Sequence, residues 1–150
     1  RSLDDLQIQE GELDPQNNPI QLNLEALFQM QEKMFQNQVN FQETGGCHGV
    51  AAFNRNGELL VLREDIGRHN AMDKVVGSLI QSKSLGQAKV ITFSGRVSYE
   101  IVSKAFRAKI PTIMAVSAPS TLAIDFAKEY GITLFSFARN GKATCYANCN

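Results

Sequence analysis

The sequence predicts a three-layer α/β/α sandwich around a mixed sheet of about five strands. Short apolar runs alternate with longer segments in which apolar residues recur at helical spacing. This alternation is typical of parallel strands that helices cover on both faces. A further observation is Asn56-Gly57, which lies between two apolar runs and indicates a β-hairpin. The hairpin makes one strand antiparallel, so the predicted sheet is mixed.

Length and composition favour one domain with a substantial core. The chain has 150 residues, of which 43% are hydrophobic. Lysine plus arginine equals aspartate plus glutamate at 15 each, so no basic excess indicates a nucleic-acid or anionic-membrane partner. No apolar run approaches the roughly 18 residues that cross a bilayer, and the opening residues lack the apolar core of a signal peptide. We therefore expect a cytoplasmic protein with neither a nucleic acid nor a membrane as partner.

Residues 1–22 are polar, contain Pro15 and Pro19, and are predicted to form a segment outside the domain, with a short strand near 6–8. The domain is expected to span 23–150. Asn23 is a favourable N-cap for a helix over about 24–37. Its expected inward face consists of Leu24, Leu27, Phe28, Gln31, Met34 and Phe35.

Strands and helices are then expected to alternate along the chain. The hairpin pairs a strand over 50–53 with one over 58–63. Helices are predicted over about 69–83, 97–109 and 119–130, and further strands over 89–93, 112–116, 132–137 and 143–146. The inward face of the helix over 69–83 is expected to be Met72, Val75, Val76, Leu79 and Ile80. Pro111 ends the second of these helices, and Gly131 ends the third in the C′ position.

The stretch from Arg63 to Lys74 joins a predicted strand to a predicted helix and carries two acids, an arginine and a histidine within six residues. One interpretation is an anion site, because a helix N-terminus presents free N–H groups. The other interpretation is structural: Glu64 and Asp65 form ion pairs with Arg68 and Lys74, and these pairs stabilise the turn.

Two more strand-to-helix turns, at 94–96 and 117–121, carry small polar or charged residues. Turns of this kind share the edge of an open α/β sheet where ligands bind. Arg68, Arg96 and three helix N-termini would converge there, which favours a phosphate-bearing, nucleotide-like ligand. Neither a Walker A pattern nor G-x-G-x-x-G is present, so the common nucleotide-binding folds are excluded.

Histidine and cysteine give weaker signals. His48 and His69 each favour a structural role over catalysis or metal binding. Cys47 could be a nucleophile, but no activating partner lies near it in the sequence, so a structural role is favoured. Three cysteines are not a secreted disulfide framework, and Cys145 and Cys149 lack further metal ligands.

Zinc deaminases carry H-x-E and, later, P-C-x-x-C. Here His48 is followed by Gly49-Val50, and Pro119 by Ser120-Thr121-Leu122, so the glutamate and both thiolates are missing. The sequence therefore predicts at most a cytidine-deaminase-like shape without zinc.

Several motifs together resemble the formate dehydrogenase accessory proteins, the FdhD/NarQ family of sulfur carriers. The similarity extends over about residues 41–146. The motifs are Thr44-Gly45-Gly46-Cys47-His48, Glu64-Asp65-Ile66-Gly67-Arg68-His69-Asn70-Ala71-Met72-Asp73-Lys74, Ser94-Gly95-Arg96, Val116-Ser117-Ala118-Pro119-Ser120 and Phe137-Ala138-Arg139-Asn140-Gly141. The second of these is highly specific.

The resemblance implies a sulfurtransferase role. A persulfide would carry sulfur from a cysteine desulfurase to the molybdenum bis(molybdopterin guanine dinucleotide) cofactor before that cofactor enters apo-formate dehydrogenase. It also implies a deaminase-like fold without zinc and a homodimer, with GDP as an analogue of one end of the cofactor. A second functional hypothesis is a non-catalytic scaffold that binds the nucleotide or cofactor and chaperones the apo-enzyme.

The resemblance also assigns candidate residues. The family's cofactor-binding segment falls on Phe137, Ala138, Arg139, Asn140, Gly141 and Lys142. The turns add Arg68, His69, Ser94, Arg96, Ser117 and His48. The family's persulfide cysteine lies in a C-x-x-C loop that precedes a segment like Arg1-Ser2-Leu3, so no catalytic residue is assigned within this chain.

Overall fold

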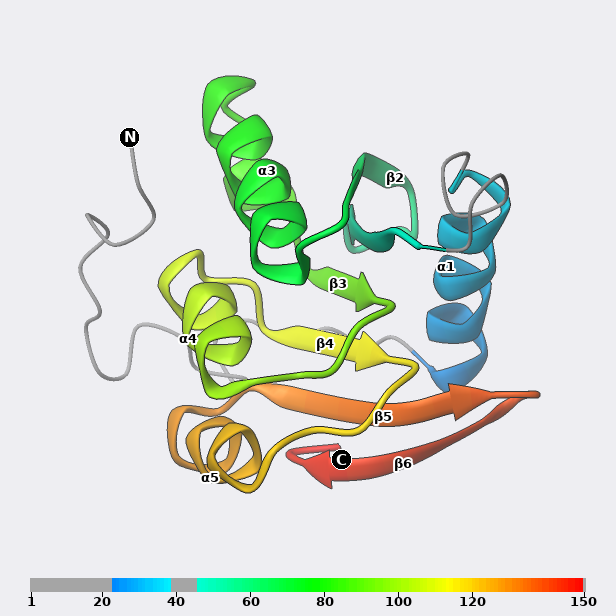
Figure 1. Ribbon diagram of the computed structural model, residues 1–150, viewed down its shortest axis with the longest axis vertical. Helices are drawn as coiled ribbons and strands as arrows, with labels where there is room; N and C mark the ends of the chain where they lie inside the picture. Colours follow the sequence, from blue (N-terminus) through cyan, green and yellow to red (C-terminus); the bar gives the residue numbers. More distant parts are fainter. Residues whose placement is uncertain (1–22, 39–45, 150) are drawn as a thin grey trace.

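The computed structural model describes residues 23–38 and 46–149 (Figure 1). The strands are β1 (His48–Phe53), β2 (Leu59–Asp65), β3 (Val90–Phe93), β4 (Thr112–Ala115), β5 (Thr133–Arg139) and β6 (Lys142–Ala147). The helices are α1 (Leu24–Gln36), α3 (Arg68–Gln81), α4 (Tyr99–Arg107) and α5 (Thr121–Tyr130), with a 3₁₀ turn η2 (Leu85–Gln87). The predicted segment over 1–22 lies outside the described residues. No helix in the described ranges is long and apolar enough to cross a membrane.

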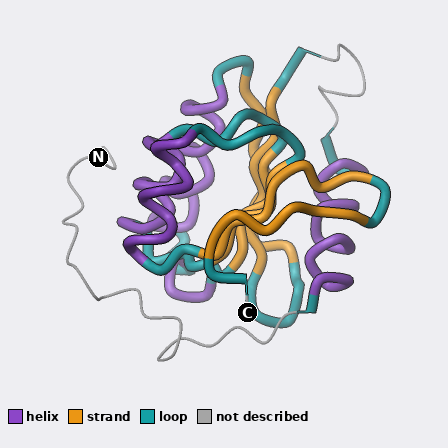
Figure 2. Tube along the Cα trace, turned by 90° about the horizontal axis from the view of Figure 1, so that it is seen from below, coloured by secondary structure: helices purple, strands orange, loops and turns teal. Residues whose placement is uncertain are grey.

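The sheet separates two helical layers, which confirms the predicted α/β/α sandwich. Figures 1 and 2 show α3, α4 and α5 on one face of the sheet and α1 on the other. The larger core cluster lies on the three-helix face and includes Val75, Ile101 and Phe126, all less than a tenth exposed. The smaller cluster packs Leu27, Met30 and Met34 of α1 against the opposite face. The likeness to cytidine deaminase stays a prediction.

The described part of the chain forms one sheet of six strands in the order β2-β1-β3-β4-β5-β6. Strand β1 is antiparallel to both β2 and β3, β3 to β5 are parallel, and β6 is antiparallel to β5. The sixth strand is the short one predicted over 143–146. The ends of β2, β3, β4 and β5 therefore share one edge with the beginning of β1. We call this the carboxyl edge.

The helix faces follow the predicted periodicity except at helix ends and at Met30 in the middle of α1. The Asn23 side chain accepts a hydrogen bond from the Ala26 N–H at 2.8 Å, as expected of an N-cap. Met30 is buried although it was not predicted, whereas Leu24 is 39% exposed. Ile80, predicted to be inward, is 41% exposed. Leu24 and Ile80 lie in terminal turns, where fewer neighbouring residues cover a side chain.

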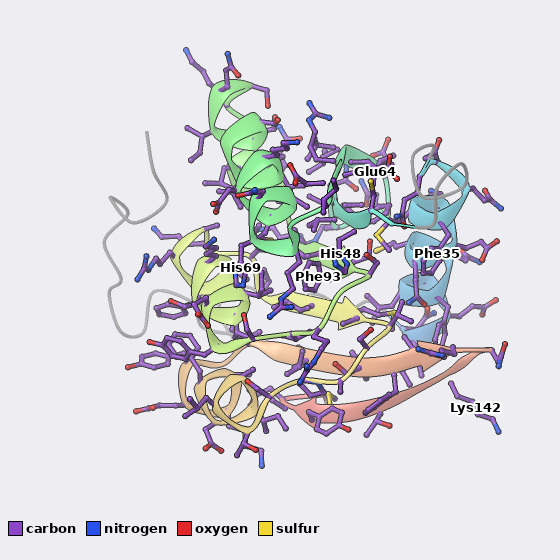
Figure 3. All side chains as sticks on the ribbon, viewed as in Figure 1. Phe35, His48, Glu64, His69, Phe93 and Lys142 are labelled. Atoms are coloured by element: carbon purple, nitrogen blue, oxygen red, sulfur yellow. A yellow bond between two sulfur atoms is a disulfide. The ribbon has the colours of Figure 1, made fainter. Side chains whose placement is uncertain are left out.

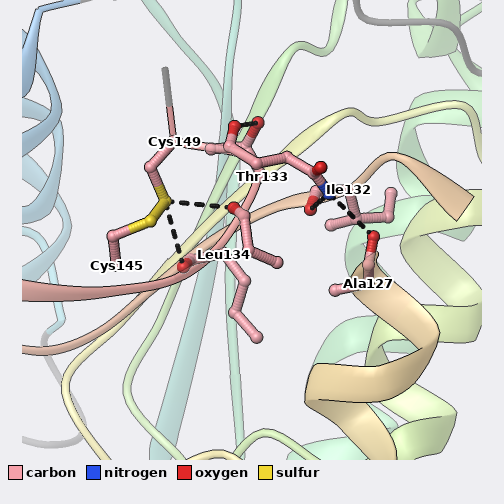
Figure 4. The surroundings of a disulfide bond; sticks show 8 residues. Ala127, Ile132, Thr133, Leu134, Cys145 and Cys149 are labelled. Carbon is pink, nitrogen blue, oxygen red and sulfur yellow. Dashed lines mark hydrogen bonds between the residues drawn. A yellow bond between two sulfur atoms is a disulfide. The ribbon is translucent and has the colours of Figure 1, made fainter. Parts of the chain in front are cut away.

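The C-terminal strand carries a disulfide between Cys145 and Cys149, whose Cα atoms are 6.0 Å apart (Figure 4). The three cysteines indicated no disulfide framework, so this bond was not predicted. Asn148 adopts a left-handed conformation at φ 51° and reverses the chain between the two cysteines. Its side-chain amide donates to the carbonyls of Ala127 and Ile132 at 2.9 and 3.0 Å. The end of β6 is thereby fastened to the junction of α5 and β5.

The turn after β2 is held by an ion pair. Lys74 Nζ lies 2.6 Å from Asp65 Oδ2, and the Gly67 N–H donates to Asp65 Oδ1 at 3.0 Å. The structural interpretation of this turn is therefore right for Asp65 and Lys74. The hydrogen bond from Lys74, followed by that from Gly67, lowers the pKa of Asp65 below its usual 3.8.

We expect Asp65→Asn to lower the free energy of unfolding at pH 7. A carboxyl whose pKa is lower when folded stabilises the protein above its unfolded pKa, and this stabilisation is lost as pH falls through the folded pKa. The difference between wild type and variant should therefore shrink below pH 3.8. Urea unfolding at several pH values measures this difference. Asp125→Asn, an exposed acid on α5, is the control. A pH-independent difference would contradict the expectation.

Reducing the disulfide should destabilise the domain. Closing a loop of this length removes about 2 kcal/mol of entropy from the unfolded chain, which corresponds to a fall in Tm of about 4–8 °C. Calorimetry with and without dithiothreitol measures the change. The double variant Cys145→Ser, Cys149→Ser should have the Tm of the reduced protein and no response to reductant. Cys47→Ser should keep the full response.

Candidate functional site

A pocket of about 240 Å³ opens at the carboxyl edge. Its lining residues come from the end of α1, the beginning of β1, and the ends of β3, β4 and β5. They are Phe35, Gly46, Cys47, His48, Ser94, Val116, Ser117 and Arg139. Figure 3 shows Phe35 on α1 and His48 at the beginning of β1. The structure thus brings together four of the predicted site residues: His48, Ser94, Ser117 and Arg139.

Hydrogen bonds fix one wall of this pocket. The Gly49 N–H donates to Ser94 Oγ at 2.7 Å, and the Ser94 N–H donates to the Gly49 carbonyl at 3.1 Å. The Ser117 hydroxyl donates to the Ser94 carbonyl at 3.3 Å. Since Ser94 Oγ acts as an acceptor for Gly49, its proton remains available for a ligand. The turns after β3 and β4 and the beginning of β1 therefore form one connected unit.

Gly95 allows a close approach behind His48. A Cβ at Gly95 would lie 3.2 Å from His48 Nδ1 and 3.3 Å from Arg68 Cβ. Any larger residue would therefore push on the imidazole or on the beginning of α3. Arg68 is adjacent to this wall but does not line the pocket, and its Nε is buried without a hydrogen-bond partner.

The helix N-termini do not line this pocket, and their predicted convergence on an anionic ligand stays a prediction. The Ser98 hydroxyl accepts from the Ile101 N–H at 3.3 Å and Ser120 Oγ accepts from Ala123 at 3.1 Å, so α4 and α5 are capped by their own serines. The pocket instead includes Phe35 of α1, which packs on the opposite face of the sheet from α3, α4 and α5. The polar groups that line it come from strand ends.

His69, the second residue of α3, also lies outside the pocket (Figure 3). Burial, and then the positive charges of Lys104 and Arg68, lower its pKa below the usual 6.5. The imidazole is therefore neutral at pH 7. Lys104 in turn pairs with Asp73 at 2.8 Å and so links α3 to α4. This environment is that of a structural histidine.

The segment from Phe137 to Lys142 forms the end of β5 and the hairpin that leads to β6. Phe137 adopts a left-handed backbone conformation at φ 55°, which a non-glycine residue keeps only where surrounding contacts impose it. Asn140 and Gly141 have φ of 52° and 72°, as expected of Asn-Gly in a two-residue hairpin turn. Gln31 Nε2 donates to the Ala138 carbonyl at 3.1 Å and fixes the segment to α1. Phe137 is 45% exposed, and only Arg139 lines the pocket.

The carboxyl edge carries positive charge although the whole chain is neutral. Within the part of the chain that the structure describes, the Arg139 guanidinium makes no ion pair and faces the pocket. Arg96 is exposed in the turn before α4, and Lys142 is exposed at the beginning of β6, away from His48 (Figure 3). Guanidinium and hydroxyl donors at such an edge suit a phosphate-bearing ligand.

Four pocket residues were not predicted: Phe35, Gly46, Cys47 and Val116. Phe35 was assigned to the core, and Cys47 to a structural role. The adjacency of Cys47 to His48 was the one sequence signal that could have placed it here. In the described residues, no group of three or more histidine, cysteine or acidic side chains is arranged to hold a metal. The prediction that no zinc is bound stays a prediction.

Comparison with known proteins gives a consistent result. The sequence profile of the FdhD/NarQ family matches residues 2–150. A protein from Streptomyces avermitilis named sulfur carrier protein FdhD is 46% identical over 130 residues, 86% of this chain and 46% of the relative. A protein of the same name from Thermoplasma acidophilum is 40% identical over 148 residues, 98% of this chain and 51% of the relative. This chain thus spans about half the length of these relatives.

A solved structure agrees with the sequence comparison. The crystal structure of a formate dehydrogenase accessory protein from Desulfotalea psychrophila superposes with a TM-score of 0.77 at 31% identity. The match covers 84% of this chain and 54% of that protein. The matching profile, the named relatives and this fold together show that the chain belongs to the FdhD/NarQ family.

Proposed function

We propose that this chain forms the cofactor-binding part of a sulfur carrier that serves formate dehydrogenase. The sulfur would come from a cysteine desulfurase as a persulfide and pass to the molybdenum bis(molybdopterin guanine dinucleotide) substrate. The observation that carries the proposal is the pocket at the carboxyl edge, where Arg139 and Ser94 present donors beside an aromatic ring. Relatives named sulfur carriers support the sulfur-transfer part.

The pocket fits one part of such a substrate. Pockets for whole small ligands typically measure about 300–1,000 Å³, whereas this one measures about 240 Å³. A guanine base or a diphosphate is of suitable size, and the rest of a dinucleotide would extend over the edge. The exposed Arg96 and Lys142 lie at that edge and suit its phosphates.

Each polar residue then has a distinct role. The Arg139 guanidinium donates to phosphate oxygens with its planar fork. The Ser94 hydroxyl proton, for which the described residues provide no acceptor, donates to the substrate. Phe35 offers a ring face for a base, and His48 is held beside it by the close approach of Gly95. Phe137 and Asn140 set the direction of the hairpin that presents Arg139.

Three further parts of the proposal concern partners. The desulfurase supplies sulfur, apo-formate dehydrogenase receives the sulfurated cofactor, and a homodimer is the expected assembly. The exposed hairpin next to the pocket is the surface nearest to the proposed transfer. A scaffold that binds the cofactor without sulfur chemistry is the alternative function, and it shares the same pocket.

Guanine nucleotides should bind in preference to adenine nucleotides, because the substrate carries guanine at its ends. Arg139→Ala should weaken GDP binding about tenfold or more, since a lost charged hydrogen bond is worth about 1.5–3 kcal/mol. Isothermal titration calorimetry with GDP and ADP measures both effects. Lys128→Ala, which removes an exposed charge on α5, is the matched control and should bind GDP like wild type. Equal GDP affinity in Arg139→Ala would remove Arg139 from the site.

The cellular role can be tested separately. Deleting the gene should abolish formate dehydrogenase activity in the native host, and returning the wild-type gene should restore it. Returning the Arg139→Ala gene should restore little, while Lys128→Ala should restore it fully. Formate-dependent dye reduction in cell extracts measures the activity. Undiminished activity in the deletion strain would overturn the proposed function.

A further inference from the structure

Cys47 is the free thiol within the described ranges, because Cys145 and Cys149 form a disulfide. It is half-buried and lines the same pocket as Arg139, His48 and Ser117. A thiol in this position faces the space that the proposed substrate occupies. In a family of sulfur carriers, a thiol that lines the ligand pocket has a direct chemical use.

The surroundings suit an anionic sulfur species. The nucleophile in sulfur exchange is a thiolate, and the group that leaves the donor is a thiolate as well. Arg139 brings positive charge into the pocket, and the Ser94 hydroxyl can donate a hydrogen bond to sulfur. None of the described residues that line the pocket is acidic.

Gln38 supplies a second observation next to the pocket, although it does not line it. Its side chain is fully buried, and within the described residues neither its amide nitrogen nor its oxygen has a hydrogen-bond partner. A Cβ at Gly49 would lie 2.4 Å from Gln38 Cδ, so the carboxamide occupies the space that this glycine leaves next to His48. An unpaired buried polar group costs about 1–3 kcal/mol, and such groups call for a missing partner. The region behind the beginning of β1 therefore holds polar groups that no other described residue satisfies.

We propose that Cys47 accepts sulfane sulfur in this pocket, as a step of the proposed function and on the assumption that the pocket is its binding site. The Cys47 thiolate attacks the outer sulfur of a donor persulfide, R–S–SH. The S–S bond of the donor breaks, a bond from Cys47 Sγ to the transferred sulfur forms, and R–S⁻ leaves with its electron pair. The transferred sulfur keeps its proton. Atoms and electrons balance without an added oxidant or reductant.

The position of Cys47 explains how sulfur transfer to it would serve the proposed reaction. Sulfur bound to Cys47 would lie beside Arg139, where the phosphate-bearing substrate is proposed to bind. Holding donor and acceptor in one pocket replaces a bimolecular encounter with an oriented transfer. Cys47 would then be a second sulfur position, distinct from the cysteine that first receives the persulfide.

Mass spectrometry with a small persulfide donor tests the inference. The chain is incubated with glutathione persulfide, alkylated and digested, and the Cys47 peptide is examined for one additional sulfur atom. We expect this modification in wild type and in the Cys145→Ser, Cys149→Ser variant. Cys47→Ser should show none. Absence of the extra sulfur on Cys47 would overturn the proposal.

A reference thiol distinguishes a specific sulfur-accepting site at Cys47 from general thiol reactivity. Lys128→Cys in the Cys145→Ser, Cys149→Ser background places a thiol on the exposed surface of α5. Cys47 should gain sulfur about tenfold faster than this thiol, because a positively charged cleft concentrates anions by about that factor or more. Arg139→Ala should remove the advantage. Equal rates at the two thiols would overturn the proposal.

GDP distinguishes this inference from the proposed function. GDP in the pocket should slow sulfur transfer to Cys47 several-fold and leave the reference thiol unaffected. If GDP binds but Cys47 gains no sulfur, the Cys47 proposal fails and the cofactor-binding proposal stands. If Cys47 gains sulfur faster than the reference thiol but GDP does not bind, the cofactor-binding proposal fails and the thiol site stands.

Discussion

The antiparallel pairing of β1 with both of its neighbours is the constraint on which the rest of the structure depends. His48 pairs with Asp65 of β2, and Val50 pairs with Phe93 of β3. The beginning of β1 therefore lies at the edge where the other strands end. The two hydrogen bonds between Gly49 and Ser94 fix this register at the pocket. In a parallel arrangement, His48 and Cys47 would lie at the opposite edge, far from Arg139.

The pocket also depends on α1, although Phe35 is the one residue of that helix among its lining residues. The Gln31 side chain holds the Ala138 carbonyl, and Met34 packs beneath Thr92, whose hydroxyl lies 3.2 Å from its sulfur. These contacts join α1 to β3 and β5. The same contacts position Phe35 and Arg139, so loss of α1 packing would change both the aromatic and the cationic side of the pocket. The shape of the pocket therefore depends on the packing of α1.

The sequence was sufficient for features that depend on local pattern. Helical periodicity and the Asn56-Gly57 turn predicted the layers and the hairpin, and the rule for strand ends predicted that Ser94 and Ser117 meet. The sequence did not predict features that depend on three-dimensional detail. The placement of His69 between α3 and α4 depends on how α3 is rotated, and the Cys145–Cys149 bond depends on the left-handed Asn148. Phe35 was hidden because an aromatic residue that lines a pocket has the same helical spacing as one in the core.

The site combines a rigid wall with an exposed arm, and a large anionic substrate requires both. Hydrogen bonds among Gly49, Ser94 and Ser117 hold the wall, so a small fragment can bind there with little loss of side-chain freedom. The hairpin bears Arg139, and its left-handed residues direct the chain past the end of the sheet. The proposed dinucleotide is larger than the pocket, so the part outside it would extend from the wall along the positive edge. Cys47 would then face the bound end of that substrate, beside Arg139.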